Sequence, residues 1–148
     1  MKTITIGEVF KDKYSFRETC FGIVKNGNKI LLVNKNNQLS LVGGGLEKGE
    51  TFKECLKREF REESGYNIID IKDLICIDCY WLAANKYPML SKANIFEIKV
   101  DLINKQKPEE EGCFVEWIDL DKAIEALPLP YHKKALEYYI ENIQIQKK

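Results

Sequence analysis

The sequence predicts an α/β (α+β) fold that forms a single domain over residues 1–148. The chain has 148 residues, which is a usual size for one domain with a real hydrophobic core. Its composition is 45% hydrophobic and 31% charged, a balance typical of folded chains rather than disordered ones. Runs with strand-like alternation are interrupted by stretches with helical spacing, and this order of elements indicates a mixed fold.

The N-terminal part is predicted to form a hairpin followed by a short strand. Residues 18–25 and 29–34 are apolar, β-rich runs, and the Asn26-Gly27-Asn28 sequence between them favours a tight turn. Residues 39–42 then predict another short strand, which ends at the three glycines 43–45.

A helix is predicted over residues 51–64. Thr51 and Glu54 have the spacing of a capping box, in which each side chain accepts a hydrogen bond from the other residue's backbone N–H. Gly65 is a typical residue just after a helix end, because it adopts a left-handed conformation without strain.

The last turns of this helix place three carboxylates where apolar residues are expected. The core-facing stripe consists of Phe52, Cys55, Leu56 and Phe60. Continued by threes and fours, the stripe reaches Glu59 and Glu63, with Glu62 beside them. Like charges at this spacing repel each other, and the negative end of the helix dipole disfavours them. A divalent cation such as Mg²⁺ would offset both effects. The alternative is a solvated helix face held by pairs such as Glu54–Arg58.

The C-terminal half is predicted to contain three strands and two helices. Residues 68–81, 94–102 and 113–118 have strand character. In the second of these, charged residues alternate with an apolar set, which indicates one buried face. That apolar set is Phe96, Ile98, Val100 and Leu102. Residues 120–127 predict a helix closed by a proline, and a last helix is predicted from about Tyr131.

The net charge and the targeting signals of the sequence predict the kind of partner that the protein binds and its location in the cell. Lys plus Arg is 23 and Asp plus Glu is 23, so no net charge attracts a nucleic acid polymer or an anionic membrane. A small molecule is therefore the expected partner. No signal peptide core or transmembrane-length run is present, which predicts a cytoplasmic protein. The oligomeric state is left open, with a homodimer among the alternatives.

The five cysteines are odd in number and scattered, which is unlike a disulfide framework. Cys76 and Cys79 form one C-x-x-C, a pattern that also occurs in zinc and redox sites. No second pair accompanies it, and in a strand the two thiols would face opposite sides. Ordinary free thiols are the favoured interpretation.

Residues 44–66, GGLEKGETFKECLKREFREESGY, resemble the signature box of the Nudix hydrolase superfamily, the MutT-like pyrophosphohydrolases. The resemblance holds at every fixed position of the box, and a looser one runs from about Phe16 to Leu127. Many members have a proline before the paired glycines, where this chain has Val42. The resemblance implies a Nudix-type α/β/α sandwich with a mixed β-sheet.

The resemblance also implies site residues and a cofactor. Glu59, Glu62 and Glu63 match the box carboxylates that coordinate a divalent metal, Mg²⁺ or Mn²⁺. The carbonyl of Gly43 matches a backbone ligand of some members. Arg58 matches the box arginine, usually a structural partner of a box carboxylate, and we include it in the catalytic set.

A further carboxylate is expected from the acidic run Glu109, Glu110 and Glu111. In MutT-like enzymes a glutamate lies six residues before the late tryptophan, and Glu111 has that spacing to Trp117. A solvated acidic loop is the alternative. Either Glu62 or Glu111 could accept the proton of the attacking water, and the sequence leaves this choice open.

The implied reaction is metal-dependent hydrolysis of a pyrophosphate bond in a nucleoside diphosphate-linked substrate. A nucleoside triphosphate, a dinucleotide polyphosphate and a nucleotide sugar all fit this description. Tyr80 and Trp81 are candidates for stacking on a base, with strand or core packing as the alternative. His132 is a candidate substrate contact or an exposed histidine at a helix start.

Two observations concern ADP-ribose as the substrate and a non-catalytic function for the fold. The ADP-ribose group tends to have a proline about sixteen residues past the box, where this chain has Leu82. A non-catalytic nucleotide-binding or sensing protein on the same fold is the other function considered. Such proteins usually lose box glutamates, and none is missing here.

Overall fold

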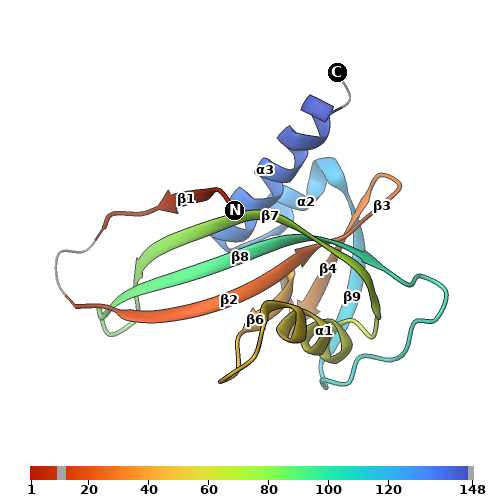
Figure 1. The fold of residues 1–148 in the computed structure, drawn as a ribbon, viewed down its shortest axis with the longest axis horizontal. Helices are drawn as coiled ribbons and strands as arrows, with labels where there is room; N and C mark the ends of the chain where they lie inside the picture. The colour runs from red at the N-terminus through yellow and green to blue at the C-terminus, as the bar shows by residue number, and fades with distance from the viewer. Residues whose placement is uncertain (10–12, 147–148) are drawn as a thin grey trace.

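The structure is a computed structural model that describes residues 1–9 and 13–146. Its strands are β1 (Thr3–Ile6), β2 (Ser15–Ile23), β3 (Lys25–Asn26), β4 (Lys29–Lys35), β5 (Gln38–Ser40), β6 (Val42–Gly45), β7 (Ile68–Leu82), β8 (Pro88–Val100) and β9 (Cys113–Asp119). Its helices are α1 (Phe52–Glu63), α2 (Leu120–Ala126) and α3 (Pro130–Gln146). Figure 1 shows these elements in a mixed α+β arrangement.

The larger sheet has five strands in the order β1-β7-β8-β2-β6. β1 runs parallel to β7 and β2 runs parallel to β8, whereas the β7–β8 and β2–β6 pairs are antiparallel. The expected mixed sheet is thus confirmed. β7 and β8 form a long hairpin that extends together with β2 away from the helices (Figure 1).

The smaller sheet contains β3, β4 and β5, with β9 paired to the other side of β4. The predicted tight turn is present between β3 and β4, where Gly27 has a φ of 61°. The long hairpin expected between residues 18–25 and 29–34 was wrong beyond this turn, because residues 15–23 pair with β6 and β8 instead. The chain leaves one sheet at Ile23 and enters the other at Lys25.

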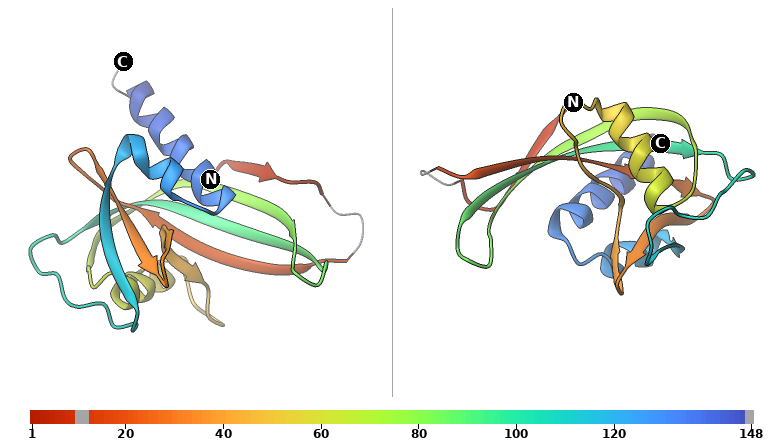
Figure 2. Two further views of the ribbon diagram at one scale, coloured as in Figure 1. Left: turned by 180° about the vertical axis from the view of Figure 1, so that it is seen from behind. Right: turned by 90° about the horizontal axis from the view of Figure 1, so that it is seen from below.

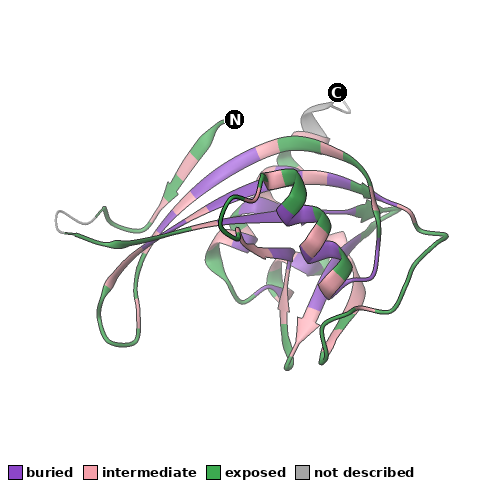
Figure 3. Ribbon diagram, turned by 60° about the horizontal axis from the view of Figure 1, so that its bottom comes forward, coloured by how far each residue is buried: buried purple, intermediate pink, exposed green. Residues whose placement is uncertain are grey.

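The helices lie on opposite sides of the strands, as the sandwich prediction requires. α1 packs against β6, β2 and β9, while α2 and α3 pack on β4, β9 and β7 (Figures 1 and 2). Each side has its own apolar cluster: Leu56 and Phe60 belong to the cluster under α1. Leu136 and Tyr139 belong to the cluster under α3. In Figure 3 the buried residues concentrate between these layers.

Three details differ from the sequence-based expectations. β1 was not predicted, since its four residues gain stability only by pairing with β7. Gly43 and its neighbours lie inside β6 rather than after a strand. Leu102 is exposed beyond β8, and the strand's other face is also buried at Ala93 and Ile95, because helices cover both sides.

No helix within residues 1–9 and 13–146 combines the length and hydropathy that a membrane crossing requires.

Candidate active site

The box helix α1 is fixed at both ends by local contacts. The Thr51 hydroxyl accepts a hydrogen bond from the Glu54 N–H at 3.1 Å, and Glu54 Oε1 accepts one from the Thr51 N–H at 3.2 Å. The capping box is therefore confirmed. After the helix, Gly65 has a φ of 74°, and a Cβ there would collide with the carbonyl of Gln106. Glycine at this position therefore allows the loop at Gln106 to pack closely against the end of the helix.

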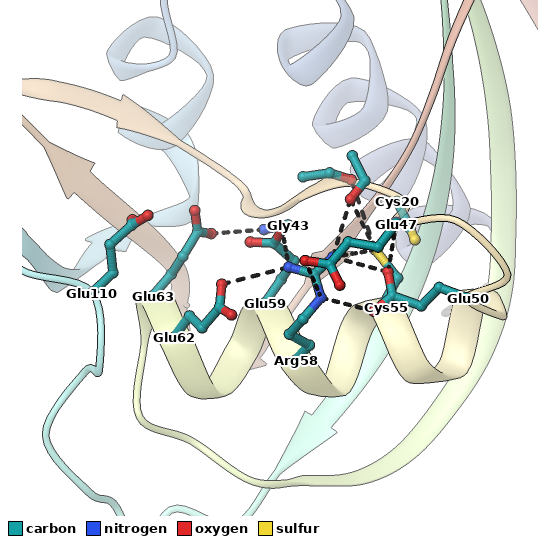
Figure 4. A network of polar contacts seen from close by, with 12 residues as sticks. Cys20, Gly43, Glu47, Glu50, Cys55, Arg58, Glu59, Glu62, Glu63 and Glu110 are labelled. Atoms are coloured by element: carbon teal, nitrogen blue, oxygen red, sulfur yellow. Dashed lines mark hydrogen bonds and ion pairs between the residues drawn. The ribbon is translucent and has the colours of Figure 1, made fainter.

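Two of the box carboxylates lie on the buried face of α1, as the apolar stripe predicts. Glu59 is 9% exposed and Glu63 only 1%. Both meet the glycines of β6: the Gly43 N–H donates to Glu63 Oε1 at 2.9 Å, and a Cβ at Gly44 would lie 2.6 Å from Glu59 Oε1. Figure 4 shows these carboxylates pointing from the helix toward the glycine strand. Only a strand without side chains can approach the acids this closely.

Arg58 is the centre of the polar network on this helix. Its Nε and Nη2 bind the two oxygens of Glu50 at 2.7 and 2.9 Å, and its Nη1 binds Glu59 Oε1 at 2.8 Å. Nη2 also donates to the Gly45 carbonyl at 3.1 Å. The contact from Nη1 to Glu62 is longer, at 3.5 Å (Figure 4). The bidentate fork fixes the loop that carries Glu50 onto the helix.

The Glu54–Arg58 pair of the alternative interpretation is not formed, because Glu54 takes part in the helix cap and Arg58 binds Glu50 and Glu59. The hydrogen bonds from Arg58 hold the pKa of Glu50 well below its usual value, at about 2. Burial raises the pKa of Glu59, and the neighbouring Arg58 opposes that rise. Glu59 is therefore a carboxylate whose negative charge depends on nearby cations.

A second cation reaches the acids from β4. The Lys35 ammonium forms ion pairs with Glu63 Oε2 and, at 3.5 Å, with Glu110 Oε2. The Cys113 thiol donates to the same Glu110 oxygen at 2.7 Å. The hydrogen bond from Cys113 and the charge of Lys35 lower the pKa of Glu110. Lys35, Glu63 and Glu110 thus form one cluster across three elements.

The acidic loop is bound to the end of α1, and it presents Glu110. The Glu110 N–H donates to the Glu62 carbonyl at 2.7 Å, and Glu109 pairs with Arg61 at 3.1 Å. Figure 4 shows the Glu110 side chain beside Glu63 and Glu62. The residue selected by its spacing to Trp117, Glu111, lies in the exposed turn after it. The contact with Lys35 of β4 distinguishes Glu110 from the other two acids of this loop.

The donor set fits a hard divalent cation. Glu59, Glu62, Glu63 and Glu110 supply carboxylate oxygens around one end of α1, and the glycine strand leaves space for them. In the described part of the chain, no group of three or more His, Cys, Asp or Glu side chains is arranged so that it could hold a metal ion. Glu63 is instead engaged by Lys35 and Gly43. Mg²⁺ needs few protein ligands, since it retains waters and binds substrate phosphates.

A cleft of about 390 Å³ lies near the glycine strand. It is lined by Arg17, Cys79, Trp81, Ser91, Leu129, Pro130 and Tyr131. The Trp81 indole N–H donates to Ser91 Oγ at 2.9 Å, which fixes the ring beside the cleft. A Cβ at Gly45 would lie 3.3 Å from an Arg17 nitrogen, so Arg17 connects the cleft with the glycine strand. Sequence reasoning missed Arg17, because a lone arginine on a strand carries no signal.

The other predicted substrate contacts, Tyr80 and His132, are not among the residues that line this cleft. Tyr80 precedes Trp81 on β7, and successive strand residues point to opposite faces. The Tyr80 ring packs against Tyr14 with centroids 5.9 Å apart. The expectation of an exposed His132 was wrong, because its imidazole is 1% exposed between Phe21 and Tyr131.

His132 is a buried structural histidine. The Leu41 N–H donates to its Nδ1 at 3.2 Å, which leaves the proton of the neutral ring on Nε2. Burial lowers the pKa of His132 to about 3. The imidazole therefore joins the start of α3 to the residue before β6, and it does so in the neutral form.

The mixed-sheet sandwich and the acid-bearing helix behind a glycine strand define a Nudix-type hydrolase domain. The NUDIX domain family model matches residues 16–141, and the chain belongs to this family. It is accordingly a hydrolase of the pyrophosphohydrolase type, which acts on acid anhydrides.

Three curated relatives resemble parts of the chain. RNA pyrophosphohydrolase of Nitratiruptor sp. is 32% identical over 65% of this chain and 70% of its own length. The NAD-capped RNA hydrolase NudC of Vibrio atlanticus is 40% identical over 33% of this chain and 20% of its own length. ADP-ribose pyrophosphatase of Methanocaldococcus jannaschii is 41% identical over 36% of this chain and 34% of its own length.

Solved structures agree in fold. A NUDIX hydrolase from Nitrosomonas europaea matches with a TM-score of 0.64 at 20% identity, over 85% of this chain and 89% of that one. An ADP compounds hydrolase matches with a TM-score of 0.63 at 19% identity, over 88% of this chain and 74% of that one.

Proposed function

We propose that this protein is a Mg²⁺- or Mn²⁺-dependent hydrolase that cleaves a pyrophosphate bond in a nucleoside diphosphate-linked substrate. The observation that carries the proposal is the burial of Glu59 and Glu63 against the glycines of β6. Two like charges buried at one helix end form a site that attracts cations, and in the metal-free protein Arg58 and Lys35 occupy it. A nucleotide sensor on the same fold is not favoured, because all the box acids are present.

Glu59, Glu62 and Glu63 are the proposed metal ligands, with the Gly43 carbonyl as a further candidate. When bound there, the metal would neutralise phosphate oxygens and lower the pKa of a coordinated water. Arg58 positions Glu59 and keeps the Glu50 loop on the helix.

A carboxylate of this site would accept the proton of the attacking water. Glu62 is one candidate, since its side chain is 34% exposed and lines a pocket with Glu109 and Glu110. The acidic loop supplies the other: spacing selects Glu111, and the contacts with Lys35 and Glu62 favour Glu110. Substitution of each residue distinguishes them.

The cleft beside Trp81 is the proposed site of the nucleoside portion. Trp81 and Tyr131 offer aromatic faces to a base. Arg17 lies between this cleft and the glycine strand, where its guanidinium can bind a phosphate. This arrangement supports a substrate with a base at one end and a diphosphate at the other.

The proposed partner is a free nucleotide derivative rather than a nucleic acid polymer, since acidic and basic residues balance. Two of the relatives are named for RNA substrates, so a capped or triphosphorylated RNA 5′ end belongs in the test. We propose a cytoplasmic location, which fits a substrate of the nucleotide pool.

The test is a product analysis by chromatography and ³¹P NMR. Nucleoside triphosphates, dinucleotide polyphosphates, nucleotide sugars, ADP-ribose and a 5′-triphosphate RNA are each incubated with Mg²⁺, Mn²⁺ or excess EDTA. We expect cleavage of at least one class, only with metal, and its loss in Glu59→Gln. Glu47→Gln is the matched control and should retain activity, because Glu47 is exposed and its pair with Arg58 is long, at 3.7 Å. Turnover in excess EDTA would contradict the metal requirement.

A further inference from the structure

We infer that Lys35 is a built-in counter-cation of the metal site, which holds Glu63 and Glu110 in the metal-free protein and competes with the divalent cation for them. The inference rests on the proposed metal-binding function. Lys35 lies outside the signature box, and its charge lowers the affinity of the site for the divalent cation and stabilises the metal-free protein.

The position of Lys35 is determined by the small sheet. It is the last residue of β4, where it pairs with Gln38 on one side and Cys113 on the other. Cys113 in turn donates to Glu110, so the acidic loop and Lys35 meet at the same sheet edge. The ammonium reaches Glu63 across the gap between β4 and α1.

The Lys35 ammonium pairs with the carboxylate oxygen of Glu63 that does not accept the Gly43 hydrogen bond. Oε1 of Glu63 accepts the Gly43 N–H, and Oε2 pairs with Lys35. Within residues 1–9 and 13–146, Glu63 has no ion pair with another cation. The charge of Lys35 also acts on Glu59. A divalent cation that binds Glu63 through Oε2 must therefore displace the ammonium.

The same contacts explain how Glu63 tolerates burial without metal. A carboxylate that is 1% exposed needs a counter-charge, since removal of one partner of a buried pair leaves an uncompensated ion. Lys35 is 38% exposed and has a flexible stem, so its ammonium can withdraw into water. Lys35 can therefore leave when the cation arrives, whereas Arg58 is fixed by short contacts with Glu50, Glu59 and the Gly45 carbonyl.

The experiment compares metal binding and metal-free stability without any substrate. Mn²⁺ affinity is measured by the electron paramagnetic resonance signal of free Mn²⁺, and the melting temperature is measured in EDTA. Lys35→Met and Lys35→Gln should melt lower than wild type in EDTA and bind Mn²⁺ about five- to thirtyfold more tightly. Lys35→Arg keeps the charge and should stay within about threefold of wild type.

The matched control is Lys29→Met on the same strand. Lys29 pairs with Asp119 at 3.4 Å on the surface, away from the acids, so its loss should change Mn²⁺ affinity by less than about twofold. Equal Mn²⁺ affinity in wild type, Lys35→Met and Lys35→Gln would overturn the role of Lys35 and leave the metal site intact. Failure of wild type and variants alike to bind Mn²⁺ would overturn the proposed function itself.

A measurement on the unmodified protein covers the case in which the neutral variants do not fold. Ammonium groups held in ion pairs give observable ¹H–¹⁵N signals, and the Lys35 signal is assigned by its absence from Lys35→Arg. We expect this signal in EDTA and its loss or a large shift with saturating Mg²⁺. A Lys35 signal that Mg²⁺ leaves unchanged would refute the displacement.

Discussion

Replacing Arg58 with methionine tests whether the box arginine acts chiefly as a structural counter-cation. Methionine keeps the length and the apolar stem of the side chain and removes the guanidinium. The substitution leaves Glu50 and Glu59 without the cation that each contacts within 3 Å. The carbonyl of Gly45 loses the donor that Arg58 supplies and keeps only the longer contact from the Cys55 thiol among its side-chain donors. The change therefore affects the helix, the loop before it and β6 together.

The magnitude follows from the burial of these groups. The side chains of Arg58, Glu50 and Glu59 are 16%, 10% and 12% exposed. Removing one partner of a buried ion pair costs about 3–5 kcal/mol, and the remaining exposure reduces this, so we expect a loss of about 3 kcal/mol. For a chain of this size, that corresponds to a melting temperature lower by roughly 6–12 °C.

The pH dependence gives a second, signed expectation. The folded-state pKa of Glu50 is lowered from 4.5 to about 2, so its pairing stabilises the fold above pH 4.5. That contribution is lost as the pH falls through the folded-state value. The stability difference between wild type and Arg58→Met should therefore shrink as the pH falls from about 4.5 toward 2.

The assay is urea unfolding followed by tryptophan fluorescence in EDTA, with Arg61→Met as the matched control. Arg61 lies on the same helix but is 51% exposed, and its pair with Glu109 should contribute no more than about 1 kcal/mol. Equal destabilisation by the two substitutions would refute the reasoning. A stability difference that does not change with pH would refute the assignment to Glu50.

Three further predictions concern the acids and the histidine. Glu62→Gln should nearly abolish turnover yet leave the melting temperature in EDTA unchanged or slightly higher. The reason is that the Glu62 side chain is 34% exposed and its contact with Arg58 is long. A clearly lower melting temperature would show that Glu62 is a structural residue. Glu110→Gln should lower kcat more than Glu111→Gln does, and the reverse order would restore the spacing argument. Proton NMR should show no titration of His132 between pH 8 and 5, since burial lowers its pKa to about 3.

The fold was largely predictable where local signals exist. The capping box, the stop at Gly65 and the apolar stripe place α1 to within a residue or two. The partners of the strands were not predictable in the same way. The turn at Gly27 identifies a hairpin, but nothing in the sequence reveals that the chain changes sheets before it. Strand pairing depends on contacts between distant segments, such as β1 with β7, which no local pattern encodes.

The acids of the candidate site and Arg58 could be predicted from the sequence, whereas Arg17 and Lys35 could not. Glu59 and Glu63 continue an apolar stripe, and a charge at a buried position is a visible departure from helical periodicity. Arg17 and Lys35 lie on strands among other charged residues and show no such departure. The same limit applies to His132, whose burial follows from the aromatic rings around it.

The arrangement of charges accounts for carboxylates at a helix end that ordinarily disfavours them. Arg58 neutralises the side of the cluster toward Glu50 and Glu59, where its short contacts with both acids and with the Gly45 carbonyl make it a fixed part of the fold. Lys35 neutralises the side toward Glu63 and Glu110 from a partly exposed position. One cation is thus permanent and the other is replaceable. Under the proposed metal-binding function, these two cations would stabilise the site without metal and would still leave Glu63, its most buried carboxylate, available to a divalent cation.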